Sequence, residues 1–300
     1  MSVLLLDQVR KTYRKTVALE NITLEVQRGE LFGLVGVNGA GKTTTLSLLM
    51  GFVQASSGQV RVLGENPWNN PGLQSRLSWL PGEVRLPDAQ TGRQWLSYQA
   101  QAAGHGLERL PALERQWEAV LDRPLRTLSK GNRQKVALLR LLTGDAEVLI
   151  LDEPTSGLDP VAQERLLETL RKLAQAGRTV LFSSHSLAEV QSLCDRVAVL
   201  DQGKVLQVGR TSDLERGQER TLKVWTRDPV PLELLSVLGG EAEFAHHAVL
   251  RGKHLLEDAL PRLFPYGIEQ VQYGGEGLEG LLTHLHDAPL EPSVLSGGRA

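Results

Sequence analysis

A glycine-rich loop between a predicted strand and a predicted helix is the feature that most restricts the fold of this chain. Apolar residues from Leu31 to Val35 predict the strand, and residues Thr44 to Met50 predict the helix. The loop matches the pattern G-x-x-x-x-G-K-[ST], whose glycines let backbone N–H groups curl around phosphate oxygens at the start of a helix. We therefore predict an α/β fold that binds a nucleotide through Gly36, Val37, Asn38, Gly39, Ala40, Gly41, Lys42, Thr43 and Thr44.

Two polar residues at the end of this loop carry its chemistry. Lys42 is expected to reach the β- and γ-phosphates of the nucleotide, and the Thr43 hydroxyl is expected to bind Mg²⁺. The alternative, a glycine-rich turn with a solvated lysine, does not account for the strand and the helix on either side. Lys42 is accordingly a candidate catalytic residue, and Thr43 a candidate metal ligand.

A second apolar run ends in two carboxylates. Residues Val148 to Leu151 predict a buried parallel strand, and Asp152 and Glu153 follow it directly. Open α/β sheets bind ligands at the carboxyl ends of their strands, so both carboxylates are expected beside the phosphates. Asp152 is a candidate Mg²⁺ residue, and Glu153 a candidate base for the attacking water. An acidic pair after a strand is by itself more often a helix N-cap, so its meaning depends on further motifs.

Three further segments accompany this acidic pair. They are Leu128 to Gln134, Pro154 to Asp159, and Ser183 to His185, the last of which follows an apolar strand from Thr179 to Phe182. In this order and at this spacing, the segments closely resemble the ATP-binding-cassette (ABC) ATPases. The resemblance covers residues 2–215. It implies a mixed sheet, an antiparallel β layer over the nucleotide, and an inserted helical subdomain at about residues 84–145.

The resemblance also implies roles for individual residues. Tyr13 is similar in position to the aromatic residue that stacks on adenine, with an ordinary hairpin tyrosine as the alternative. His185 resembles the switch histidine that contacts the γ-phosphate, and Asp159 the aspartate that couples two nucleotide sites. The signature segment, which binds ATP held by a second subunit, corresponds to Ser129, Lys130, Gly131 and Asn132.

The chain departs from the family pattern at the signature and in the segment Leu77 to Glu83. Lys130 stands where the signature commonly has glycine, and Asn132 where it commonly has glutamine. Gly82 stands where the family usually has a glutamine that senses Mg²⁺ and the attacking water. We expect Glu83 to take over part of this role, because a carboxylate is a harder oxygen ligand than an amide. A solvated turn glutamate is the alternative.

Composition agrees with a soluble, cytoplasmic enzyme, and the resemblance implies that it acts at the inner face of the cell membrane. The 300 residues are 41% hydrophobic, which suffices for a large core, and the net charge of −2 gives no general attraction to nucleic acid. No apolar stretch approaches the roughly eighteen residues of a membrane-spanning helix, so a transport function would need a separate transmembrane permease. The single cysteine, Cys194, is expected to be buried, in a reducing compartment.

The region after the cassette predicts a second, smaller domain. Its charged, glycine-containing beginning predicts a linker, which we set at 216–220. Strands are expected at 221–226, 248–251 and 268–273, and helices at 231–238, 254–264 and 278–286. We expect an α+β domain over 221–288 with a regulatory or dimer-supporting role. Proline, serine and glycine predict a disordered tail at 289–300.

These features favour the ATP-hydrolysing subunit of an ABC exporter, in which two subunits, identical or different, close around ATP and Mg²⁺. Two alternatives remain. One is a soluble cassette ATPase that acts on ribosomes or DNA; such relatives join two cassettes, or insert coiled coils or zinc modules, and this chain has one cassette and no cysteine cluster. The other is an ATP-binding regulator with weak hydrolysis, which Gly82 and Lys130 keep open.

Overall fold

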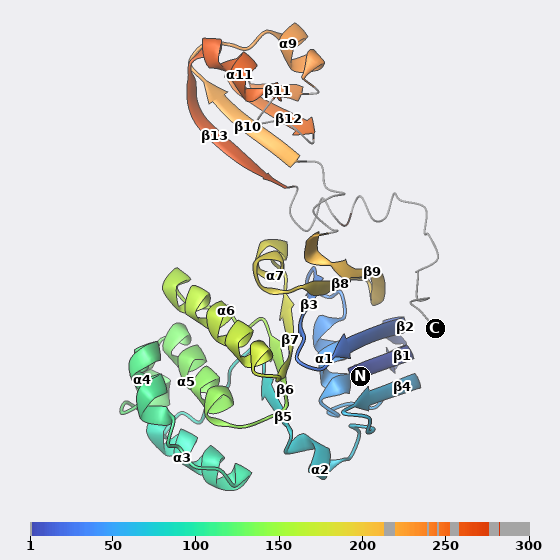
Figure 1. The fold of residues 1–300 in the computed structure, drawn as a ribbon, viewed down its shortest axis with the longest axis vertical. Helices are drawn as coiled ribbons and strands as arrows, with labels where there is room; N and C mark the ends of the chain where they lie inside the picture. The colour runs from blue at the N-terminus through green and yellow to red at the C-terminus, as the bar shows by residue number, and fades with distance from the viewer. Residues whose placement is uncertain are drawn as a thin grey trace. The chain divides into compact units, whose positions relative to one another are not determined.

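The computed structural model divides into two compact units, Met1–Thr211 and Ser212–Ala300 (Figure 1). It describes residues 2–212, 220–238, 240–244, 246–252, 258–275 and residue 282. From the sequence we place the end of the first domain at 215, and the structural division lies slightly earlier in the chain. The predicted tail at 289–300 and residues 216–219 of the predicted linker lie outside the described residues.

A six-stranded mixed sheet forms the centre of the first unit. Its strands run in the order β5 (Leu77–Leu80), β6 (Val148–Asp152), β7 (Thr179–Ser184), β3 (Leu31–Gly36), β8 (Arg196–Asp201) and β9 (Lys204–Arg210). The first five are parallel, and β9 is antiparallel to β8. Every residue of β3, β6 and β7 is buried, as expected for continuous apolar runs in a parallel sheet.

A three-stranded antiparallel sheet packs beside this central sheet. Its order is β2 (Thr16–Gln27), β1 (Ser2–Tyr13) and β4 (Ser57–Val62). Alternation along β2 sets its buried face, because Leu24 and Val26 are buried whereas Glu25 between them is exposed. These apolar side chains share one hydrophobic core with Leu46 and Leu49 of α1 (Lys42–Leu49), the helix that follows the glycine-rich loop.

The predicted helical insertion connects β5 to β6. It contains α3 (Gly92–Ala103), α4 (Leu110–Trp117), the 3₁₀ turn η1 (Leu125–Thr127) and α5 (Lys130–Thr143), which gather on one side of the unit in Figure 1. Apolar residues between 91 and 142 recur at helical spacing, which predicts that Leu96, Leu110 and Trp117 lie in the core, and all three are buried. The same prediction is wrong for Tyr98, a residue that is 63% exposed. Leu96 and Ala100 form the buried stripe of α3, and a residue two positions after Leu96 points away from that stripe.

Two helices after β6 complete the first unit. α6 (Pro160–Gln175) connects β6 to β7, and α7 (Leu187–Leu193) connects β7 to β8, while the short α2 (Pro71–Gln74) precedes β5. Proline at the first position of α6 supplies the backbone angle that starts a helix. Cys194 after α7 is buried, and this burial raises the pKa of its thiol. Within the described residues, no helix has the length and apolar character needed to cross a bilayer.

The second unit contains a four-stranded antiparallel sheet. Its order is β11 (Gly240–Phe244), β12 (His247–Gly252), β10 (Arg220–Thr226) and β13 (Ile268–Gly275), and its short helices are α9 (Leu232–Val237), α11 (Leu260–Leu263) and η2 (Phe264–Tyr266). Leu222, Val224 and Leu250 of the sheet form a core with Leu235 and Leu263. The sequence pattern does not predict β11, because its five residues include no β-branched side chain. Of the helix predicted at 254–264, residues 254–257 lie outside the described residues, and the described part contains α11 and the start of η2. Residues 278–286 apart from residue 282 also lie outside, so the helix predicted there is not described.

A close approach between β3 and α7 yields a stability prediction. A Cβ atom on Gly33 would lie 2.2 Å from Val190 Cγ1 and 3.2 Å from Cys194 Sγ. Gly33→Ala should therefore lower the free energy of unfolding by about 1–3 kcal/mol, the usual cost of overpacking a core. Urea denaturation measures the loss. The double variant Gly33→Ala/Val190→Ala should lose less than the sum of the two single variants, and strictly additive losses would contradict this contact.

Candidate nucleotide-binding and hydrolysis site

An open cleft of about 900 Å³ lies at the carboxyl ends of the parallel strands. It includes most of the residues predicted to bind nucleotide or metal, namely Val37, Asn38, Gly39, Gly41, Lys42, Thr43, Thr44, Glu83, Asp152, Glu153 and His185. The predicted residues that do not line it are Tyr13, Gly36, Ala40, Asp159 and the four signature residues. Gly82, the position where the family usually has a glutamine, also lines it. Lining residues to which the sequence assigned no role are Thr16, Val17, Ala18, Trp79, Pro81, Ser156, Gln202 and Gly203.

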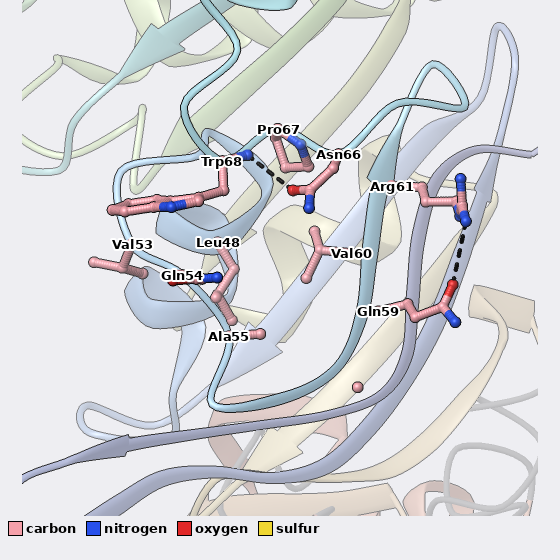
Figure 2. Close-up of a pocket in the computed structure, with 11 residues that line it drawn as sticks. Leu48, Val53, Gln54, Ala55, Gln59, Val60, Arg61, Asn66, Pro67 and Trp68 are labelled. Atoms are coloured by element: carbon pink, nitrogen blue, oxygen red, sulfur yellow. Dashed lines mark hydrogen bonds between the residues drawn. The ribbon is translucent and has the colours of Figure 1, made fainter.

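A second, smaller pocket of about 250 Å³ lies where α1, β4 and the chain after each of them meet. Figure 2 shows Leu48, Val60 and Trp68 around it, with Arg61 hydrogen-bonded to Gln59 at its side. None of its lining residues, all in the described part of the chain, is a carboxylate, a histidine or a predicted nucleotide residue. The phosphate and metal chemistry predicted from the sequence therefore belongs to the larger cleft.

The glycine-rich loop turns sharply into α1. Gly41, at the N-cap of α1, has φ +107°, which L side chains rarely adopt, and a Cβ atom there would lie 2.6 Å from Leu19 Cδ2. Lys42 follows as the first helical residue, and its side chain is buried. Lys42 Nζ donates to the carbonyl oxygens of Gly36 at 2.6 Å and Val37 at 3.3 Å. The backbone of the loop thus holds the ammonium group inside the cleft.

The ammonium group of Lys42 also faces Glu153. Its Nζ lies 3.5 Å from Glu153 Oε1, a buried oxygen that makes no hydrogen bond within the described structure. Oε2 of the same carboxylate lies 2.6 Å from His185 Nδ1. The Glu153 side chain is 20% exposed and the His185 side chain is 66% exposed, so the histidine is the more solvent-accessible member of this pair. The Glu153 carboxylate is therefore held between a lysine and a histidine in the cleft.

Asp152 and Thr43 form a second polar pair in the cleft. Thr43 Oγ1, in the first turn of α1, donates to Asp152 Oδ2 at 2.7 Å, and Asp152 is buried at the last position of β6. Hydroxyl and carboxylate oxygens are the hard ligands that Mg²⁺ prefers. The two side chains therefore fit the metal that the sequence predicts.

Gly82 and Glu83 line the same cleft after β5. A Cβ atom on Gly82 would lie 3.6 Å from Asp152 Oδ2, so the backbone at this position passes close to the carboxylate. Glu83 turns instead to Arg85, whose Nη2 donates to Glu83 Oε2 at 2.8 Å, and the Glu83 side chain is 76% exposed. This hydrogen bond lowers the pKa of Glu83.

The signature residues form the start of α5. Ser129 is the N-cap, and its Oγ accepts a backbone N–H of the first turn. Lys130 Nζ donates to Ser156 Oγ at 3.1 Å. A Cβ atom on Gly131 would lie 2.7 Å from the carbonyl oxygen of Gly157, so the two backbones approach closely here. The signature thus packs against the loop after β6 of its own chain.

Tyr13 lies at the end of β1, beside the hairpin turn. Its side chain is 43% exposed, and Lys11 Nζ lies 4.7 Å from the ring centre, at a cation–π distance. The facing residues Thr16, Val17 and Ala18 line the cleft instead. The hairpin therefore borders the cleft through β2. The sequence instead predicts a contact through Tyr13, which lies on β1.

A hydroxyl network joins the loops after β6 and β7. Ser184 Oγ donates to Glu189 Oε2 at 2.7 Å, and Thr155 Oγ1 donates to the same oxygen at 3.1 Å. Glu189 lies in the first turn of α7, so its carboxylate ties the segment after Glu153 to the segment that carries His185. Sequence reasoning missed Glu189 and Thr155. The available signal was a pair of hydroxyl residues at the end of an otherwise apolar strand.

Asp159 caps α6. Its Oδ1 accepts the backbone N–H of Ala162 at 2.9 Å, and Lys135 Nζ lies 3.9 Å from Oδ2. The hydrogen bond from Ala162, assisted by the charge of Lys135, lowers the pKa of Asp159 below its ordinary value of 3.8. The residue that the resemblance links to dimer coupling thus also stabilises the start of a helix.

This cap predicts a pH-dependent contribution to stability. Because the folded-state pKa is depressed, the stabilisation from Asp159 is fully present above 3.8 and is lost as the pH falls through the lower folded-state value. Asp159→Asn keeps a capping oxygen and removes the charge. In urea denaturation the wild type should be the more stable protein at neutral pH, and the difference should shrink as the pH falls below 3.8. A difference that does not change with pH would contradict the role of the charge.

Comparison with known sequences identifies relatives of this chain. A family model described as ABC transporter matches residues 19–156. An uncharacterised ABC transporter ATP-binding protein of Nostoc is 37% identical over 243 residues, covering 74% of this chain and 70% of the relative. The Nod factor export ATP-binding protein I of Cupriavidus metallidurans is 38% identical, with coverage of 71% and 73%. The linearmycin resistance ATP-binding protein of Bacillus subtilis is 33% identical over 69% of each chain.

Solved structures share the fold. The structure of an ATP-binding subunit of an ABC transporter has a TM-score of 0.67 at 31% identity, and the match covers 71% of this chain and 92% of that chain. A dimeric ATP-binding cassette bound to ADP and phosphate has a TM-score of 0.65 at 21% identity, covering 69% of this chain and 98% of that one; this likeness concerns the fold. Identity above 30% over more than two thirds of both chains shows that this chain belongs to the ABC transporter family as an ATP-binding subunit.

Proposed function

We propose that this chain hydrolyses ATP and, as one of two ATP-binding subunits, powers a separate membrane permease that exports a substrate. One observation carries the proposal. Lys42, Asp152, Glu153 and His185, which follow three different strands of the central sheet, line one cleft. Glu153 lies between Lys42 at 3.5 Å and His185 at 2.6 Å. A cation for phosphate, a carboxylate for a metal and a carboxylate base are the parts that phosphoryl transfer to water requires.

The glycine-rich loop is the proposed phosphate site. Backbone N–H groups at the start of α1 bind phosphate oxygens in this proposal, and Lys42 exchanges its carbonyl partners for them. Thr43 and Asp152 would hold Mg²⁺, which would supply positive charge to offset the charge of the phosphates. Tyr13 is the proposed adenine contact, since β2 of the same hairpin lines the cleft.

Glu153 is the proposed general base. Its side chain lines the cleft between Lys42 and His185, and its Oε1 makes no hydrogen bond within the described structure, so this oxygen has an open acceptor position for a proton from water. As the water oxygen bonds to the γ-phosphorus, the bond between that phosphorus and the ADP oxygen breaks, and the water proton moves to Glu153. His185, bonded to Oε2, orients the carboxylate and is the proposed γ-phosphate contact.

A second subunit completes each site in this proposal. Ser129, Lys130, Gly131 and Asn132 do not line the cleft of their own chain, and Ser129 and Lys130 are exposed at the start of a 14-residue helix. The start of a helix favours an anion, which fits the γ-phosphate of ATP held by a partner. Asp159 is the proposed coupling residue between the two sites. A solved cassette of the same fold is dimeric, which supports this arrangement.

The export role rests on the relatives. Two of them are named for Nod factor export and linearmycin resistance. By analogy, the chain would act at the cytoplasmic face of the membrane and contact its permease through residues 83–91 and the helices that follow. Residues 221–288 are the proposed regulatory or dimer-supporting domain. No nucleic acid partner is expected.

Replacing Glu153 tests the proposed base. Glu153→Gln should reduce steady-state ATP hydrolysis by about 10²–10⁴-fold, because an amide cannot take the water proton. ATP binding should persist, and light scattering should show a dimer with Mg·ATP. Phosphate release measures turnover. Hydrolysis by the variant at the wild-type rate would remove Glu153 as the base. Lys42→Ala is the control for ATP binding, which this variant should lose.

Two further results decide between the proposal and its alternatives. A wild-type chain that binds ATP without turnover, even with its permease, would favour the ATP-binding regulator that Gly82 and Lys130 keep open. Stimulation of hydrolysis by ribosomes or DNA would favour a soluble cassette ATPase.

Glu83 is the remaining proposed metal residue, and its ion pair provides the test. Its carboxylate has to leave Arg85 to approach Asp152. Arg85→Ala should therefore lower the Mg²⁺ concentration for half-maximal hydrolysis, and Glu83→Ala should raise it, each by no more than about fivefold because an exposed ion pair is weak. Identical Mg²⁺ dependence in the wild type and both variants would remove Glu83 from the metal site.

A further inference from the structure

Ser183 connects the two carboxylates of the cleft through one hydroxyl group. It is the penultimate residue of β7 and is fully buried. Its Oγ donates to Asp152 Oδ1 at 2.5 Å and accepts the backbone N–H of Glu153 at 3.0 Å. A serine hydroxyl offers one donor and two acceptor positions, so both bonds form at once. The last registered pair between β6 and β7, Asp152 with Ser183, brings the groups together.

The bond to Glu153 stabilises an unusual backbone. Glu153 has φ +46°, in the left-handed region that residues other than glycine seldom occupy. This turn comes directly after the last pair of the β6–β7 ladder. Because the Glu153 N–H lies beyond the ladder, the Ser183 hydroxyl takes the place of a strand carbonyl as its partner. A strained residue persists only where its surroundings hold it, and Ser183 supplies part of that support.

The bond to Asp152 fixes the plane of its carboxylate. Ser183 holds Oδ1, and Thr43 holds Oδ2 at 2.7 Å. With one hydroxyl on each oxygen, the carboxylate cannot rotate without losing a bond. The neighbouring Ser184 does not duplicate this role, since it donates to Glu189. Adjacent residues of a strand point to opposite faces, which explains why two consecutive serines serve different carboxylates.

We propose that Ser183 is a positioning residue for hydrolysis: it sets the orientation of Asp152 and the backbone turn that directs Glu153 into the cleft. The inference rests on the proposed ATPase function. Ser183 does not line the cleft, so it acts through Asp152 and Glu153 and touches no substrate. Replacing Ser183 should therefore lower the turnover rate and the gain in ATP affinity that Mg²⁺ provides. The affinity for ATP in the absence of Mg²⁺ should stay unchanged.

Ser183→Ala tests the inference against a matched control on the same strand. Thr179, at the opposite end of β7, is also buried and accepts one backbone N–H, from Gly29 at 3.1 Å, so Thr179→Val removes a comparable hydroxyl far from the cleft. Ser183→Ala should lower kcat about 10–100-fold, the usual effect of losing a partner that orients a ligand, and KM for Mg·ATP should rise as the contribution of the metal to binding is lost. Thr179→Val should keep the wild-type kcat.

Calorimetric titration of ATP provides a readout that does not depend on turnover. With Mg²⁺ present, Ser183→Ala should lose most of the gain in ATP affinity that the metal gives the wild type; with chelator present, both proteins should bind ATP equally. Ser183→Cys keeps the shape of the side chain with a larger atom and forms only weak hydrogen bonds, so its kcat should fall between those of the wild type and Ser183→Ala. If the alanine variant does not fold, the cysteine variant carries the comparison.

The outcomes separate this inference from the function on which it rests. Wild-type kcat and Mg²⁺ response in Ser183→Ala, with Glu153→Gln inactive, would overturn the role of Ser183 and leave the ATPase proposal intact. If Thr179→Val lost as much kcat as Ser183→Ala, the loss would reflect a general weakening of β7. This result would also overturn the positioning role of Ser183. Unchanged hydrolysis in Glu153→Gln would instead contradict the proposed function.

Discussion

The parallel pairing of β6 and β3 with β7 is the constraint on which the candidate site depends. Asp152 pairs with Ser183, and Val35 pairs with Ser184. These registers bring the glycine-rich loop, the acidic pair and the histidine loop, which are far apart in the sequence, to one edge of the sheet. Because every residue of the three strands is buried, one strand end cannot shift without disturbing both the ladder and the packed core.

At this edge, neutral hydroxyls hold carboxylates, and one carboxylate stays available for chemistry. Thr43 and Ser183 each bind one oxygen of Asp152, and Ser184 binds Glu189. Such donors fix a carboxylate without neutralising it, so its charge is kept for a metal or a phosphate contact. Glu153 differs, because one of its oxygens makes no hydrogen bond in the described structure and faces Lys42. The geometry thus distinguishes carboxylates with a hydroxyl partner on each oxygen, such as Asp152, from Glu153, the proposed base.

The departures from the family pattern lie at the start of α5 and in the segment after β5, which lines the cleft. Lys130 bonds Ser156, a residue that lines the cleft, and so connects the signature to the loop after β6. Gly82 brings backbone close to Asp152, while Glu83 is engaged by Arg85 outside the Asp152–Thr43 pair. The contacts at these positions join loops of one chain, while the phosphate loop and acidic pair remain assembled.

The sequence by itself determined the α/β class, the positions of β3, β6 and β7, and a cleft shared by Lys42, Asp152, Glu153 and His185. These follow from local apolar runs, loop chemistry and the rule that parallel strands end at one edge. Only the tertiary structure decided that Tyr98 is exposed, that β11 joins the second sheet, and which oxygen each hydroxyl binds. The reason is physical: side-chain direction and strand register depend on packing between distant segments, and no local pattern contains that information.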